Sequence, residues 1–153
     1  MLTKQYWRFI QNPSSLVARV LKGCYFSNGN LVNARSKFSS SFVWKSLVWG
    51  RKLLNVGSCW RIGLGNSAFI YKDRWLLQPS IFQAYYWPVL GTSTTVNQLK
   101  LSYGAWNERT IQTAFFQKDA ETILNIPPSL SGVEDILCWY YDPHGLYTVK
   151  SGY

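Results

Sequence analysis

Residues 41–77 read SFVWKSLVWGRKLLNVGSCWRIGLGNSAFIYKDRWLL, and they hold four of the chain's eight tryptophans: Trp44, Trp49, Trp60 and Trp75. The same stretch carries six lysines and arginines against a single carboxylate, Asp73. A tryptophan ring needs either a core or a flat partner. Aromatic rings interleaved with cations therefore have two interpretations. They fit an aromatic core with a solvated basic exterior, and they also fit a surface that binds a polyanion.

The first half of this stretch predicts a helix. Ser41 is a favourable N-cap for a helix from about Phe42 to Asn55, and Gly57 suits its exit. Gly50 within it allows a close approach by another element. The large side chains at helical spacing form one face, made by Trp44, Leu47, Val48, Arg51 and Leu54.

The second half changes period. Residues 59–62 and 68–72 read as two short strands, and the glycine-containing residues 63–67 predict a hairpin turn between them. Gly63-Leu64-Gly65 superficially resembles a phosphate loop. It lacks the third glycine of the dinucleotide fingerprint and the Gly-Lys-Ser/Thr ending of a P-loop. We therefore expect a β-hairpin here and not a nucleotide site.

The flanking sequence predicts further short elements. Upstream, residues 12–22 predict a helix capped by Asn12, followed by a polar loop at 27–41. Its apolar face is Leu16, Val17, Val20, Leu21 and Cys24. Downstream we expect a connector at 78–95, a helical turn at 96–101, helices at 108–116 and 119–124, a hairpin of 136–141 with 146–149, and Ser151 as the cap of a further helix.

Together these elements predict an α+β fold, in which a basic helical N-terminal part is followed by short β-hairpins and helices. The expected parts are a basic helical part at 1–57, a Trp-rich β-hairpin at 58–77, a connector at 78–95, and an α+β part at 96–153 that is truncated at its C-terminal end.

Charge is distributed unevenly along the 153 residues. Residues 1–72 contain eleven lysines and arginines and no aspartate or glutamate, whereas residues 73–153 contain five basic and seven acidic side chains. Such a field attracts polyanions, most commonly nucleic acid and less often an anionic membrane. No apolar run approaches the ~20 residues of a membrane span, and the N-terminus lacks a signal-peptide core, so we expect an intracellular protein with no membrane partner.

Several ordered motifs resemble a known family. Nearly the whole chain, and most clearly Gly50-Arg51-Lys52-Leu53-Leu54-Asn55-Val56-Gly57, Trp60-Arg61-Ile62-Gly63-Leu64-Gly65 and Asp73-Arg74-Trp75-Leu76, resembles the segment that follows the polymerase core in plant LINE-type (non-LTR) retrotransposon reverse transcriptases. The resemblance implies a thumb- or connection-like piece of a polyprotein, between the polymerase core and a zinc-binding and ribonuclease H region. It also implies a nuclear location if the chain is parent-like, and a mitochondrial one if it is organelle-encoded.

The resemblance and the charge together predict weak, salt-dependent binding to the backbone of an RNA–DNA hybrid or duplex, with the remainder of the parent polyprotein as a second partner. Trp60 and Trp75 are expected in the core rather than stacked on bases. The candidate phosphate contacts are Arg19, Lys22, Arg35, Lys37, Lys45, Arg51, Lys52 and Arg61.

Catalysis is not indicated. The aromatic-x-Asp-Asp turn of reverse transcriptases is absent, and Tyr140-Tyr141-Asp142-Pro143 offers a single aspartate. Three dispersed cysteines and one histidine, His144, lack the ligand spacing of a zinc site. We therefore expect no catalytic residue, metal or cofactor, and buried free thiols in a reducing compartment.

Two alternatives remain open. One is a translated relic without a function of its own, which fits departures from the family pattern at Leu64, Tyr71 and Arg74. The other is a host-recruited interaction module that exposes aromatic side chains, with Tyr85, Tyr86 and Trp87 as candidates that could also serve as a base-stacking platform.

Overall fold

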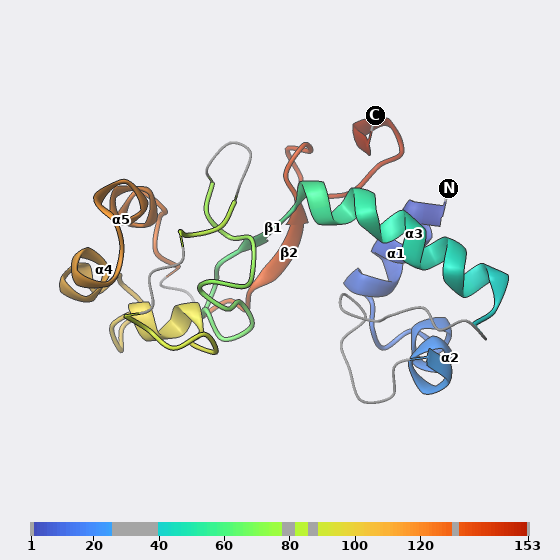
Figure 1. The fold of residues 1–153 in the computed structure, drawn as a ribbon, viewed down its shortest axis with the longest axis horizontal. Helices are drawn as coiled ribbons and strands as arrows, with labels where there is room; N and C mark the ends of the chain where they lie inside the picture. The colour runs from blue at the N-terminus through green and yellow to red at the C-terminus, as the bar shows by residue number, and fades with distance from the viewer. Residues whose placement is uncertain (1, 26–39, 78–81, 86–88, 130–131, 153) are drawn as a thin grey trace. The chain divides into compact units, whose positions relative to one another are not determined.

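The computed structural model describes residues 2–25, 40–77, 82–85, 89–129 and 132–152 (Figure 1). In this part of the chain there are five α-helices and one two-stranded antiparallel sheet, so the fold is α+β. The chain divides into two compact units. Unit 1 comprises residues 1–58 and 139–153, and unit 2 comprises residues 59–138.

Unit 1 is helical. Its helices are α1 (Leu2–Gln11), α2 (Leu16–Tyr25) and α3 (Phe42–Gly57), and η3 (Lys150–Gly152) is a short 3₁₀ turn. Helix α1 packs along α3 (Figure 1). The contact is close because Gly50 has no side chain: a Cβ there would lie 3.2 Å from the backbone nitrogen of Thr3.

Helix α3 follows the sequence prediction. The Ser41 hydroxyl accepts a hydrogen bond from the Trp44 N–H at 3.2 Å, which confirms the cap. The predicted face is confirmed as well, because Trp44, Leu47 and Leu54 are buried. Gly57 ends the helix where the Trp139 indole ring occupies the space that a side chain would need.

The prediction for residues 12–22 was wrong in its start and its packing. Helix α1 runs to Gln11, and α2 begins only at Leu16, where the Ser15 hydroxyl accepts from the Ala18 N–H at 3.4 Å. The expected apolar face is not a core face: Leu16 is 73% exposed, and α2 buries only Ala18. Helical spacing shows which side chains share a face but not whether another element covers it.

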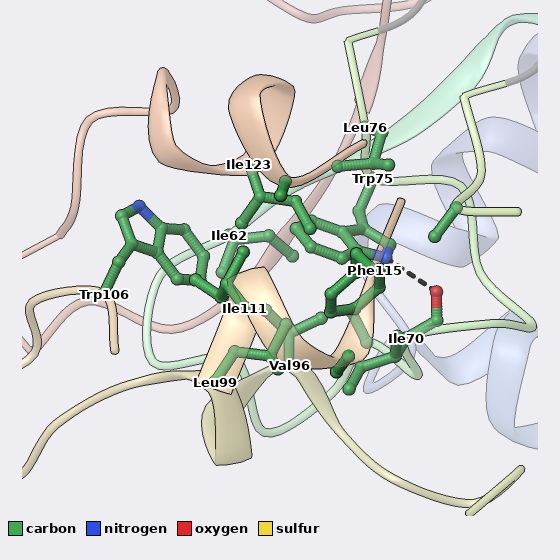
Figure 2. Packing of buried hydrophobic residues seen from close by; sticks show 14 residues of the cluster. Ile62, Ile70, Trp75, Leu76, Val96, Leu99, Trp106, Ile111, Phe115 and Ile123 are labelled. Atoms are coloured by element: carbon green, nitrogen blue, oxygen red, sulfur yellow. Dashed lines mark hydrogen bonds between the residues drawn. The ribbon is translucent and has the colours of Figure 1, made fainter. Parts of the chain in front are cut away.

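Unit 2 is organised around a dense aromatic and aliphatic cluster. Its regular elements are η2 (Val96–Leu99), α4 (Glu108–Ala114) and α5 (Gln117–Leu124), which confirm the helices predicted there. Figure 2 shows the cluster, in which the buried Trp75 indole N–H donates to the Ile70 carbonyl at 2.9 Å. The Trp106 ring stacks near it at 6.4 Å between centroids. Trp75 is therefore a core residue, as expected.

Both predicted hairpins were wrong. Strand β1 (Ser58–Arg61) does not pair with residues 68–72 but with β2 (Ile136–Trp139), far along the chain. Residues 68–70 instead hydrogen-bond the 94–96 segment, with the Ile70 N–H donating to the Thr94 carbonyl at 3.0 Å. Short strands carry little register information of their own, and distant contacts decide their partner.

In the second expected hairpin, the first strand is confirmed in part as β2, and the turn is confirmed. The Asp142 carboxylate accepts from the N–H groups of His144 and Leu146, and Gly145 adopts φ 72°. Residues 146–149 form no strand, and the Tyr147 ring among them is buried edge-on against Trp139 at 4.9 Å. The predicted loop at 27–41 lies almost entirely outside the described residues.

Candidate functional site

The two units differ in net charge, as the two halves of the sequence do. Unit 1 contains ten lysines and arginines against one acidic residue, Asp142, which gives a formal charge of +9. Unit 2 contains six basic and six acidic residues, which gives zero. The formal net charge of the chain therefore belongs to unit 1. An uncompensated charge of this size creates a positive field around one helical body.

Helices α2 and α3 expose most of the predicted phosphate contacts in unit 1. Arg19 and Lys22 are exposed on α2, and Lys45 and Lys52 are exposed on α3. Arg35 and Lys37 lie outside the described residues, and Arg61 is exposed on β1 and belongs to unit 2. Four of the eight candidates therefore lie exposed on two helices of the same unit.

Arg51 has a different environment. It is half-buried, and it hydrogen-bonds the hydroxyl of the buried Tyr6 on α1. Burial raises the pKa of the Tyr6 hydroxyl, and the nearby Arg51 guanidinium partly offsets that rise. Arg51 thus contributes to the α1–α3 contact, which is a structural role that the sequence pattern could not separate from phosphate binding.

The structure adds three cations that sequence reasoning missed: Lys4 and Arg8, exposed on α1, and Lys150 in η3. Helix α1 itself was not predicted. Its inward face follows helical spacing, and this spacing was the sequence signal that could have predicted the helix. The face consists of the buried Tyr6 and Trp7 and the half-buried Thr3 and Ile10. Lys150 joins unit 1 only through the tertiary fold.

Aromatic contacts hold the basic helices of unit 1 together. Tyr25 at the end of α2 stacks on Trp44 of α3, with ring centroids 4.7 Å apart and planes 4° from parallel. The Tyr25 hydroxyl also donates to the Ser41 hydroxyl at 2.8 Å. These contacts link the two helices that carry Arg19, Lys22, Lys45 and Lys52.

The loop at residues 63–67 binds an anion, but the anion is part of the chain. The Asp135 carboxylate accepts three backbone hydrogen bonds, from Gly63 at 2.8 Å, Gly65 at 2.7 Å and Ser67 at 2.7 Å. Gly65 needs its glycine, since its φ is 84°. Backbone N–H groups that converge in this way form an anion-binding site, and here a carboxylate of the chain itself occupies it. The loop is therefore structural, although it is not the expected hairpin turn.

Next to this loop lies a hollow of about 240 Å³. Its described lining includes Asn97, Lys100 and Tyr103. The Lys100 ammonium donates to the Gly63 carbonyl and lies 5.0 Å from the Trp106 ring centroid. Burial lowers the pKa of Lys100, and the nearby Asp135 charge opposes that change. Lys100 thus stabilises the loop.

Other carboxylates are also engaged by backbone groups. Asp119 is fully buried and accepts from the Tyr85 N–H at 2.8 Å, and Asp73 accepts from the Phe69 N–H at 2.7 Å. Burial raises the pKa of Asp73, while the Phe69 hydrogen bond and Lys72 lower it. Within the described ranges, no three His, Cys, Asp or Glu side chains lie close enough to hold a metal ion.

The expected buried free thiols are confirmed in part. Cys59 is buried, Cys138 is half-buried and Cys24 is exposed, and all three are free. Burial raises the pKa of Cys59 to about 11, with Arg74 lowering it and Cys138 raising it further. His144 is exposed in its turn.

A membrane span takes about 20 apolar residues, and no described helix combines that length with sufficient hydropathy.

Comparison with known proteins gives one partial likeness to report. Over 77 residues the chain is 32% identical to the "Uncharacterized mitochondrial protein AtMg00310" of Arabidopsis thaliana. The aligned part covers half of each protein, so this chain spans about half the length of the curated relative it matches. No protein-family profile and no solved structure matches the chain. The relative's name assigns no function.

Proposed function

We propose that this chain is a non-catalytic, thumb- or connection-like piece of a retrotransposon reverse transcriptase polyprotein, and that unit 1 binds the backbone of nucleic acid. The observation that carries the proposal is the concentration of the entire formal net charge of +9 in unit 1. Exposed lysines and arginines neutralise phosphates and release counterions with little sequence preference. The motif resemblance supports the polyprotein origin, and a template-primer duplex is the corresponding ligand.

The test measures binding of a fluorescently labelled RNA–DNA hybrid by anisotropy at several salt concentrations between about 50 and 200 mM. One variant replaces three exposed unit 1 cations by glutamine. A matched control removes the same total charge from exposed positions of unit 2. The unit 1 variant is Arg19→Gln, Lys22→Gln and Lys52→Gln, and the control is Lys72→Gln, Arg109→Gln and Lys118→Gln.

We expect the wild-type chain to bind with a steep salt dependence. The slope of log K against log[salt] should become shallower by about 2 to 3 in the unit 1 variant, since each lost phosphate contact contributes about 0.9. The unit 2 control should keep the wild-type slope. Equal losses in both variants would mean that total charge and not a surface of unit 1 is responsible. A folded chain that binds no hybrid at low salt would refute the proposal and favour the relic.

A further inference from the structure

The outer face of α3 combines exposed aromatic rings with lysines. Phe42 is 85% exposed and Trp49 is 72% exposed. Lys45 and Lys52 precede and follow Trp49 by four and three residues, a spacing that places all of these side chains on one side of a helix. The row is completed by the exposed Val56.

This face is not the core face of the helix. The opposite side of α3 buries Trp44, Leu47 and Leu54, so the fold already uses one apolar side of α3. Single apolar side chains are common on protein surfaces and need no explanation. Two aromatic rings alternating with two cations along about three helical turns form a pattern that matches a specific kind of ligand.

Charge complementarity selects that ligand. The face belongs to unit 1, whose formal charge of +9 disfavours a cationic partner and attracts a polyanion. The α-carbons of Lys45 and Lys52 lie roughly 10 Å apart along the helix axis, which is a span of a few nucleotides. An exposed indole between two ammonium groups offers a stacking surface flanked by phosphate contacts. In a duplex the base faces are already stacked on each other, whereas a single strand presents them.

We propose that this face of α3 binds single-stranded nucleic acid, with a base stacked on Trp49 and the neighbouring phosphates contacted by Lys45 and Lys52. The inference rests on the proposed nucleic-acid binding of unit 1. It adds that the ligand is single-stranded and that Trp49 is the residue on which a base stacks. Stacking on an aromatic side chain accepts any base, so the binding is tolerant of sequence.

The test compares the wild-type chain with Trp49→Leu and Trp49→Phe, using a labelled single-stranded oligonucleotide and a duplex of the same sequence. Trp49 is exposed, so neither substitution removes a core contact. Leucine keeps an apolar side chain but has no ring, and phenylalanine keeps a smaller ring. Far-UV circular dichroism and a thermal melt confirm that the variants fold as the wild type does.

We expect Trp49→Leu to weaken single-strand binding by roughly 5- to 150-fold. Trp49→Phe should fall between the wild type and Trp49→Leu, and duplex binding should change less than about twofold in both variants. Wild-type binding with no loss in Trp49→Leu would overturn this inference alone and leave the face to a protein partner. Equal losses for both ligands would overturn the strand selectivity. A wild-type chain that binds neither ligand would overturn the proposed function as well.

Discussion

Removing the Asp135 carboxylate should destabilise unit 2, because one side chain holds the loop at residues 63–67 through three backbone N–H groups. The N–H groups of Gly63 and Gly65 belong to buried residues and share one carboxylate oxygen, while Ser67 is exposed and donates to the other. In Asp135→Ala, water can replace the acceptor at Ser67 but reaches the two glycine N–H groups poorly.

The magnitude follows from those three bonds. Hydrogen bonds to a charged group contribute about 1.5–3 kcal/mol each, and a buried donor left unsatisfied costs about 1–3 kcal/mol. Two buried donors and one exposed donor give an expected loss for Asp135→Ala of about 3–5 kcal/mol. Asp135→Asn keeps one carbonyl oxygen for the glycines but turns an NH₂ group toward the Ser67 N–H, so its expected loss is about 1–2 kcal/mol.

Urea unfolding followed by tryptophan fluorescence measures these losses, since Trp75 and Trp106 report on the core of unit 2. Glu134→Ala is the matched control, because it removes the same charge from the exposed neighbouring residue. We expect the wild type and Glu134→Ala to have the highest urea midpoints. The midpoint of Asp135→Asn should be lower, and that of Asp135→Ala should be the lowest. An Asp135→Ala midpoint equal to that of Glu134→Ala would refute the assignment of the loop's stability to this carboxylate.

Three further predictions test other parts of the structure. Gly63→Ala should prevent stable folding of unit 2, because a Cβ at this position would overlap the Val133 carbonyl oxygen; a native-like urea midpoint would show that the loop does not pass that close. Ser41→Ala should lower stability by about 1 kcal/mol through loss of the α3 cap, seen as a fall in the melting temperature, and an unchanged melt would contradict the cap geometry. At pH 8, a thiol reagent should modify Cys24 quickly and Cys59 only on unfolding, because Cys59 is buried and its pKa is raised to about 11. The Cys59 thiol holds its proton more tightly in the folded chain than in the unfolded chain, where its pKa is 9.0. The protonated thiol therefore contributes its full stabilisation of the folded chain below about pH 9. That stability, on the order of 3 kcal/mol at most, is lost as pH rises through 11. Fast labelling of Cys59 in the folded chain would disprove its burial.

Local rules predicted the helices well. Helix α3, its Ser41 cap and its buried face followed from capping chemistry and helical spacing, both of which act within four residues. The same rules located η2, α4 and α5. They failed for α1, whose signal was present but overlooked, and for the start of α2, where Ser15 and not Asn12 caps the helix.

The candidate site was predicted in part. Sequence alone showed the basic character of the N-terminal half and named four cations that the structure places exposed on α2 and α3. It could not separate Arg51, which contacts Tyr6, from the exposed lysines. Helical spacing did separate two tryptophans of α3: it placed Trp44 on the expected apolar face and left Trp49 off it, and the structure buries Trp44 and exposes Trp49.

The sequence by itself determined the α+β class, the positions of α3, α4 and α5, and the polarity of charge along the chain, because these depend on composition and on contacts between near neighbours. Only the tertiary structure decided that β1 pairs with β2, that Asp135 occupies the glycine loop and that residues 139–153 join the basic unit. Each of these links residues more than sixty positions apart. A short strand or a lone carboxylate carries no local signal of such a partner, so its choice depends on the packing of the whole unit.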